Sequence, residues 1–151
     1  HDVAFGRLAS LLSSRDAYQE LADQYRKRIV HITEADRPDL MIDLASVLQE
    51  HLADNTGAIS VLEEVLALRP DDKKALDALA VLYPGVRRWR EAGRVMERLA
   101  EISRSDAEVV GYLLQLAQIE NDHLHEAQKA IEVTEKVLER DPDNRQAREM
   151  L

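Results

Sequence analysis

Cysteine is absent from this chain, and glycine, proline and aromatic residues are scarce. Without cysteine the chain can form neither disulfides nor thiolate zinc sites, and it offers no cysteine nucleophile. Only 5 glycines and 4 prolines are available to make turns, and aromatic residues are 4% of the 151 positions. The composition instead relies on Ala, Leu, Glu, Arg and Asp, which favour helices, so we expect an all-α protein.

Long apolar runs and an excess of basic residues are also missing. No stretch approaches the roughly 18 apolar residues that a membrane-spanning helix needs, so no membrane insertion is expected. The net charge of -9 argues against nucleic acid as a partner, because phosphate neutralisation supplies most of the affinity of such binders. No secretory signal is visible, and the chain begins on His1 and ends inside a predicted helix. We therefore expect it to be part of a longer protein.

Two stretches 72 positions apart share ten of 22 residues. HLADNTGAISVLEEVLALRPDD (51–72) aligns without a gap on HLHEAQKAIEVTEKVLERDPDN (123–144). A fainter repeat has half this period, because a Leu-Ala pair recurs at steps of 36, 35 and 37, namely at Leu8-Ala9, Leu44-Ala45, Leu79-Ala80 and Leu116-Ala117. A period of this length is typical of helical arrays, in which stacked units bury a continuous core.

Apolar residues flank each Leu-Ala pair at helical spacing. Three positions before each Leu stand Phe5, Met41, Leu76 and Leu113, and three positions after each Ala stand Leu12, Leu48, Tyr83 and Glu120. Glu120 is the one polar exception in this stripe. A second stripe follows about 12 residues later at Leu21, Ala58, Ala92 and Ala130. Each unit is therefore predicted to contain two antiparallel helices that pack through their apolar stripes.

The pattern predicts helices over 3–13, 16–33, 38–52, 55–68, 73–83, 88–103, 106–122, 126–140 and 144–151. Asp54 and Asp72 are expected to cap helix N-termini, and Ser105 with Glu108 fits a capping box. Pro84-Gly85 lies at the turn inside the third unit rather than at a domain boundary. Because proline disfavours helical backbone at the preceding residue, we expect the helix before it to end up to a turn early and to leave a notch there.

One unit carries most of a known repeat pattern, at Leu76, Leu79-Ala80, Tyr83, Trp89 and Ala92. This pattern resembles the tetratricopeptide repeat family, and the 72-residue period is similar to that of long bacterial arrays of the family. The resemblance implies a right-handed α-solenoid of about four antiparallel helix pairs plus a partial C-terminal helix. The expected units within one domain are 2–34, 38–71, 73–105 and 110–143, with 144–151 starting a further helix.

Motifs that support catalysis or cofactor binding are not found. The chain lacks G-x-S-x-G, a P-loop and G-x-G-x-x-G. His123-x-His125 invites a metal hypothesis, but residues two apart point to different faces of a helix. His51 and His123 occupy the same repeat position, at the end of a first helix, so a structural role in the corner is favoured. We therefore expect no enzyme activity, no cofactor and no metal.

The family resemblance implies that first helices line a groove for a partner peptide or helix. Carried over to this chain, the groove positions are Ser10, Asp39, Ile42, Ser46, Gln49, Lys74, Asp77, Val81, Leu114, Gln118 and Asn121. Only Lys74 among them is basic. The expected partner is therefore another protein that offers a neutral to basic segment rather than an acidic tail.

Four arginines form a second candidate surface, at Arg87, Arg90, Arg94 and Arg98. They fit a convex docking strip for an acidic partner, or a solvated outer face balanced by nearby glutamates, and the solvated face is favoured. The leading functional hypothesis is a non-enzymatic scaffold. The alternatives are a structural spacer or self-assembly module, in which exposed solenoid ends pair two copies, and the accessory arm of an enzyme whose catalytic domain lies elsewhere.

Overall fold

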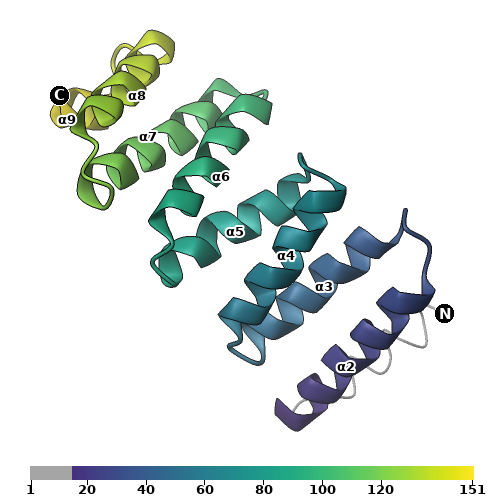
Figure 1. Ribbon diagram of the computed structural model, residues 1–151. Coiled ribbons are helices and arrows are strands. Elements are labelled where there is room, and N and C mark those ends of the chain that lie inside the picture. Colours follow the sequence, from purple (N-terminus) through teal and green to yellow (C-terminus); the bar gives the residue numbers. More distant parts are fainter. Residues whose placement is uncertain (1–14) are drawn as a thin grey trace. The chain divides into compact units, whose positions relative to one another are not determined.

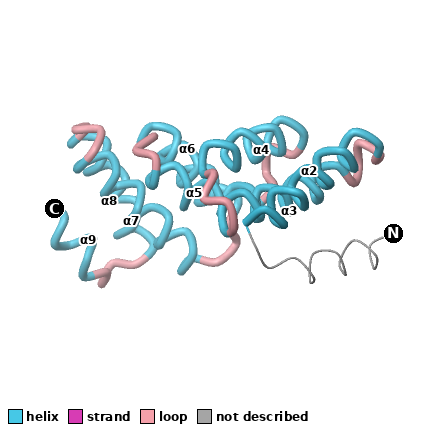
Figure 2. Tube along the Cα trace, turned by 90° about the horizontal axis from the view of Figure 1, so that it is seen from below, coloured by secondary structure: helices cyan, strands magenta, loops and turns pink. Residues whose placement is uncertain are grey.

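A computed structural model describes residues 15–151, which form eight helices and no strand. The helices are α2 (Arg15–His31), α3 (Arg37–Glu50), α4 (Asn55–Leu68), α5 (Lys73–Gly85), α6 (Trp89–Ile102), α7 (Asp106–Asp122), α8 (Ala127–Arg140) and α9 (Arg145–Met150) (Figure 1). Short loops join them (Figure 2). The all-α solenoid fold class is confirmed. The expected helix over 3–13 lies outside the described residues.

The chain divides into two compact units, residues 1–75 and 76–151. From here on, the first unit and the second unit mean these two compact units, each of which is about twice as long as one of the four predicted repeat units. In the first unit, α3 packs against both α2 and α4. Its core contains the stripe residues expected from the sequence, since Leu21, Met41, Leu44, Ala45, Leu48, Ala58 and Leu62 are all buried. Alternating helices therefore bury their apolar stripes against each other, as the half-period repeat predicts.

The second unit repeats this arrangement. Its α7 packs against both α6 and α8, and α9 adds to α8. The buried stripe residues here are Leu76, Leu79, Tyr83, Ala92, Met96, Leu113, Leu116, Ala117 and Ala130. The helix α5 begins in the first unit and lies mainly in the second. Below, α3, α5 and α7 are called first helices, and α2, α4, α6 and α8 are called second helices.

Aromatic stacking gives the 72-residue period a physical basis. The rings of Tyr18 and His51 stack with centroids 3.7 Å apart, and those of Trp89 and His123 with centroids 3.5 Å apart. In each compact unit, an aromatic residue near the start of one helix thus stacks on the histidine that follows the next helix along the chain. Tyr18 of α2 stacks on His51 after α3, and Trp89 of α6 stacks on His123 after α7. The two histidines therefore have the structural role in the corner that their shared repeat position suggests.

The three turns from a first to a second helix close in the same way. The backbone N–H of the residue before each second helix donates to the carbonyl of the fourth stripe residue, in the pairs Asp54 to Leu48 (2.8 Å), Arg88 to Tyr83 (2.9 Å) and Glu126 to Glu120 (2.8 Å). Each turn also contains one left-handed residue, with φ of 52° at Ala53, 60° at Arg87 and 54° at His125. None of these three is glycine, so each turn carries some backbone strain.

Pro84 does not shorten its helix, and the predicted early end and notch are wrong. Pro84 lies inside α5, which continues to Gly85. Relative to the Leu-Ala pair, α5 therefore ends at the same repeat position as α3 at Glu50 and α7 at Asp122. Proline is tolerated here because only one helical residue follows it, so the lost backbone hydrogen bond lies in the last turn. The turn that follows is one residue shorter than its two equivalents.

Two of the expected caps form and one does not. Asp54 Oδ1 accepts from the N–H of Gly57 at 2.9 Å, and Asp72 Oδ1 accepts from the N–H of Ala75 at 3.0 Å. Ser105 occupies the N-cap position of α7, but its side chain makes no capping hydrogen bond, so the predicted capping box with Glu108 is wrong. The carboxylates of Asp106 and Glu108 in the first turn instead favour this helix start through the helix dipole.

Candidate functional site

The first unit presents predicted groove residues on one face of α3. Asp39 and Ser46 are exposed and Ile42 and Gln49 are half-buried, whereas the interleaved Met41, Leu44, Ala45 and Leu48 are buried. Helical periodicity thus separates a core side from a solvent side along α3. Ser10, the remaining predicted residue of this part of the chain, lies outside the described residues.

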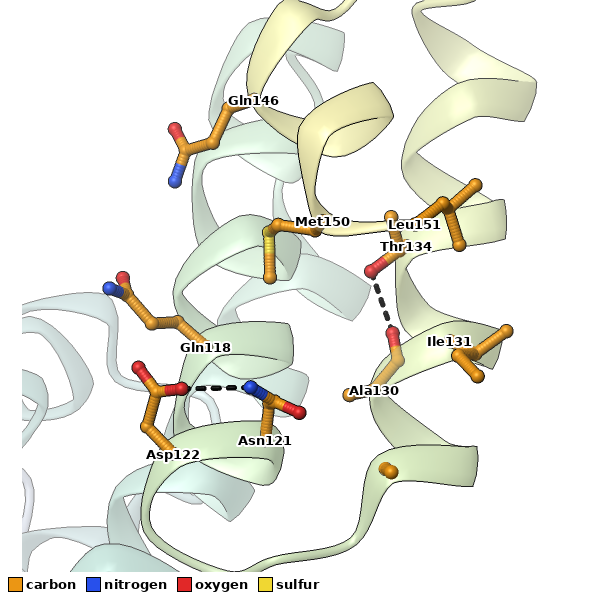
Figure 3. A pocket seen from close by; sticks show the side chains of 10 residues that line it. Gln118, Asn121, Asp122, Ala130, Ile131, Thr134, Gln146, Met150 and Leu151 are labelled. Carbon is orange, nitrogen blue, oxygen red and sulfur yellow. Dashed lines mark hydrogen bonds between the residues drawn. The ribbon is translucent and has the colours of Figure 1, made fainter.

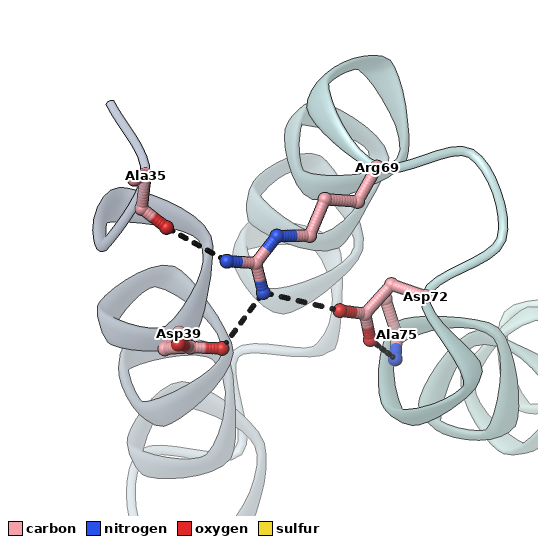
Figure 4. Close-up of polar contacts among 5 residues, drawn as sticks. All are labelled: Ala35, Asp39, Arg69, Asp72 and Ala75. Carbon is pink, nitrogen blue, oxygen red and sulfur yellow. Dashed lines mark hydrogen bonds and ion pairs between the residues drawn. The ribbon is translucent and has the colours of Figure 1, made fainter.

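Asp39 is already paired within the protein (Figure 4). Arg69, at the end of α4, contacts Asp39 Oδ1 at 2.9 Å and donates to the carbonyl of Ala35 at 2.7 Å. The same guanidinium lies 3.6 Å from Asp72 Oδ2, at the start of α5. Arg69 therefore ties together three chain segments, and sequence reasoning missed it because two of its partners, Asp39 and Ala35, lie 30 and 34 positions away. Asp39 consequently has a structural contact as well as an exposed surface.

Asp43 adds negative charge to this face, one turn after Asp39. Burial raises the pKa of Asp43, the neighbouring Asp39 raises it further, and Lys74 lowers it. Tyr25 of α2 faces the same group, and burial followed by the charge of Asp43 raises the pKa of its phenol. The i, i+4 spacing of the two aspartates was a sequence signal for this acidic pair, although Asp43 was not among the predicted groove residues.

In the second unit, predicted residues lie on α5 and α7. The Tyr112 hydroxyl donates to Asp77 Oδ1 at 3.0 Å and so joins the two first helices. Val81 is 67% exposed, so its aliphatic side chain is open to solvent on this face. Leu114 is half-buried. This face thus combines an apolar contact point with a polar link that sequence reasoning also missed.

Gln118 and Asn121 of α7 line a pocket of about 300 Å³ (Figure 3). Helix α8 contributes Ile131 and Thr134, and α9 contributes Gln146 and Met150. The Thr134 hydroxyl donates to the Ala130 carbonyl at 2.7 Å, and Asn121 donates to Asp122 Oδ1 at 2.9 Å. The lining is therefore a mixture of amide and apolar groups, with no arrangement typical of a catalytic site.

The arginine strip is not a continuous helical stripe. Arg87 lies in the turn before α6, whereas Arg90, Arg94 and Arg98 lie on α6 and are exposed. Arg98 pairs with Glu101 at 2.8 Å, and Arg90 lies 3.7 Å from Glu126. Arg87 is the left-handed residue of the inter-helix turn, two positions before α6 begins, so the four arginines do not share one helical face.

Within residues 15–151, no group of three or more His, Asp or Glu side chains is arranged to hold a metal ion. No helix in this part of the chain is both long and apolar enough to cross a membrane.

Residues 75–110 match the sequence model of the tetratricopeptide repeat. The chain resembles the tetratricopeptide repeat family. The matched segment contains most of the third predicted unit and the start of the fourth. No curated protein sequence matches the chain.

Among solved structures, the chain is similar to one described as "MamA RS-1 ArsTM double mutant". The two share 19% sequence identity with a TM-score of 0.68, and the match covers 99% of this chain and 87% of that one. At this identity the likeness shows a tetratricopeptide-type fold. Such a fold is typical of protein-interaction scaffolds and is typically non-catalytic.

Proposed function

We propose that this chain is a non-enzymatic scaffold that binds a peptide or helix of another protein on the exposed faces of its first helices. One observation carries the proposal. None of the ten predicted groove residues within the described part of the chain is buried, whereas the stripe residues between them form the core. Each first helix thus keeps a solvent-facing side that the fold does not require for its own packing.

The charge of the first unit's face favours a neutral to basic partner. Asp39 and Asp43 stand one turn apart, and Lys74 is the basic group that lowers the pKa of Asp43. A partner that brings a lysine or arginine here would relieve the repulsion between the two carboxylates. In the second unit, exposed Val81 offers an apolar anchor beside the polar Asp77 and Tyr112 pair.

Site-specific photo-crosslinking tests this proposal. A photoreactive phenylalanine analogue replaces Ser46 on α3 or its repeat equivalent Gln118 on α7, which are both exposed. Ser60 on α4 and its equivalent Glu132 on α8 are exposed positions on second helices and serve as matched controls. These four sites avoid Asp39 and Asp77, whose substitution would also break contacts inside the protein.

We expect the first-helix positions to crosslink a discrete protein in cells that express the chain, at a yield at least about fivefold above the second-helix controls. A substitution Val81→Glu should reduce crosslinking from Gln118 if the partner uses that anchor. Equal crosslinking from all four positions, or none from Ser46 and Gln118, would contradict the proposal.

A further inference from the structure

An apolar groove in the first unit lies on a different side of α3 from the residues discussed above. Its volume is about 480 Å³, and its lining residues come from the end of α2, the start of α3 and the end of α4, namely Ile29, Val30, Arg37, Met41, Glu64, Ala67 and Leu68. Val30 is 70% exposed and Leu68 is 48% exposed. Two large aliphatic side chains of second helices therefore line this groove and face solvent.

The second unit contains the same groove at equivalent positions, and there it is charged. All seven lining residues have a counterpart 71 or 72 positions later that lines the matching groove. Val30, Ala67 and Leu68 are replaced by Glu101, Glu139 and Arg140. Two of these charges are paired, Glu101 with Arg98 and Arg140 with Asp106, each at 2.8 Å. The fold thus does not require apolar residues on this rim.

The positive charge of Arg37 in the first unit's groove indicates that the groove accepts a ligand with a carboxylate. Arg37 replaces the buried Val109 of the second unit, and it makes one weak hydrogen bond, 3.5 Å to the Ile32 carbonyl. Its Nε is buried and has no hydrogen-bond acceptor, and Arg37 forms no ion pair within residues 15–151. Glu64 also lines the groove but forms no ion pair with Arg37 within residues 15–151. A guanidinium that is partly desolvated without a paired carboxylate is costly, and a partner carboxylate would supply the missing acceptor.

We propose that this groove binds an amphipathic helix of a partner protein, which inserts apolar side chains between Val30 and Leu68 and pairs a carboxylate with Arg37. The first unit has no strand among its described residues, so it offers no sheet edge for an extended peptide to join. A groove between two helices accommodates the apolar stripe of a third helix. This surface is separate from the first-helix faces of the proposed function.

A display library of 16-residue amphipathic helices tests the proposal against the purified chain. The apolar positions of the library vary among Leu, Ile, Met and Phe, and the flanking positions vary among all residues. We expect enriched peptides to carry Asp or Glu beside the apolar stripe. In fluorescence anisotropy, Leu68→Arg should weaken their Kd at least tenfold, because it places in this groove the residue that the second unit has there.

Matched variants separate this groove from other surfaces. Arg140→Leu in the second unit and Ser46→Arg on the first-helix face of α3 should leave the Kd within about twofold. Arg37→Gln should reduce the preference for an acidic over a lysine-substituted peptide from about tenfold to nearly none. Circular dichroism of each variant checks that the helices are retained, which Leu68→Arg should permit because this side chain is half in solvent.

Three results of the peptide experiments would overturn the proposal. The first is a library that yields no enriched peptide, and the second is enriched peptides that bind the Leu68→Arg variant as tightly as the original chain. The third is enriched peptides that lack acidic residues and bind the Arg37→Gln variant with unchanged preference. Analytical ultracentrifugation of the chain alone tests whether a second copy of the chain occupies the groove instead. A dimer that Leu68→Arg abolishes would show that a second copy fills the groove, and would also overturn the proposal.

Discussion

The corner between α3 and α4 in the first unit buries an aliphatic side chain at the fourth stripe position, whereas the equivalent corner between α7 and α8 in the second unit has a carboxylate there. Leu48 of α3 is 1% exposed, and the matching residue of α7 is Glu120. Both corners close through the same 2.8 Å backbone hydrogen bond to this position. The backbone turn therefore accepts either side chain, and the side chain determines how the corner responds to mutation and pH.

Glu120 depends on neighbours that the first unit lacks. Burial raises its pKa, Glu126 and Glu97 raise it further, and Lys129 lowers it. Lys129 also donates to Glu126 and lowers the pKa of that carboxyl. At the position of Lys129 the first unit has Gly57, so a carboxylate in the first corner would lack the lysine that accompanies Glu120.

The largest expected effect comes from giving the first corner the residue of the second. Leu48→Glu should lower the free energy of unfolding by about 3–5 kcal/mol, because it places a carboxylate at a fully buried aliphatic position that lacks the equivalent of Lys129. Urea unfolding followed by far-UV circular dichroism measures the change. Leu48→Met is the size-matched control and should cost less than about 1.5 kcal/mol.

The reciprocal substitution should act in the opposite direction. Glu120→Leu removes a partly desolvated carboxylate and leaves the Glu126 and Lys129 pair intact, so it should stabilise the second unit by about 1 kcal/mol. The fluorescence of Trp89, the one tryptophan of the chain, reports this unit directly. If Glu120→Leu lowered the free energy of unfolding, or if Leu48→Glu left it unchanged, the proposed difference between the two corners would be wrong.

The stacked histidines test what the two units share. His51→Ala and His123→Ala should each cost about 1 kcal/mol, because each removes a ring stacked on Tyr18 or Trp89. A double-mutant cycle with Tyr18→Ala or Trp89→Ala should give a coupling energy of similar size in both units. Coupling in one unit and none in the other would contradict a shared structural basis for the 72-residue period.

A smaller effect should appear with pH. Because the folded-state pKa of Glu120 is raised, its stabilising contribution is complete below the unfolded pKa and is lost as pH rises through the folded value. Glu120→Gln should therefore be more stable than the original chain near pH 7, by less than about 1 kcal/mol after solvent screening. The two should converge near pH 4, as urea unfolding at both values would show. A difference that grows on acidification would contradict the assignment.

The smallest effect concerns the left-handed turn residues. Arg87→Gly and His125→Gly should each raise the free energy of unfolding by about 0.5 kcal/mol, because glycine adopts positive φ without strain. Arg94→Gly, at an exposed position in the interior of α6, should instead cost about 1 kcal/mol. Thermal unfolding of the three variants distinguishes these signs. Loss of stability in both turn variants would mean that their side chains have contacts worth more than the strain.

Much of the fold was predictable because periodicity reports burial. The stripes around Leu44-Ala45 and Leu116-Ala117 form the cores, and the Asp54 and Asp72 caps form where expected. Pro84 was misjudged because proline signals the end of a helix without fixing which residue of the last turn it occupies. The single-domain description and the boundaries of the four units stay predictions.

The candidate sites were less predictable, because they depend on contacts between residues far apart in the sequence. Sequence reasoning found the solvent side of α3 but not Arg69, which pairs with Asp39 across 30 positions. It noted Glu120 as a polar exception without its ties to Glu126 and Lys129. It also did not single out Val30 and Leu68, since an exposed apolar residue near a helix end resembles a buried one in sequence.

Hydrogen exchange on the complex with the crosslinked partner tests the proposed scaffold function most directly. Amides of α3, α5 and α7 should exchange at least about tenfold more slowly in the complex than in the free chain, whereas those of α4, α6 and α8 should change little. Protection confined to the second helices, or no protection in the first helices, would contradict binding on the first-helix faces.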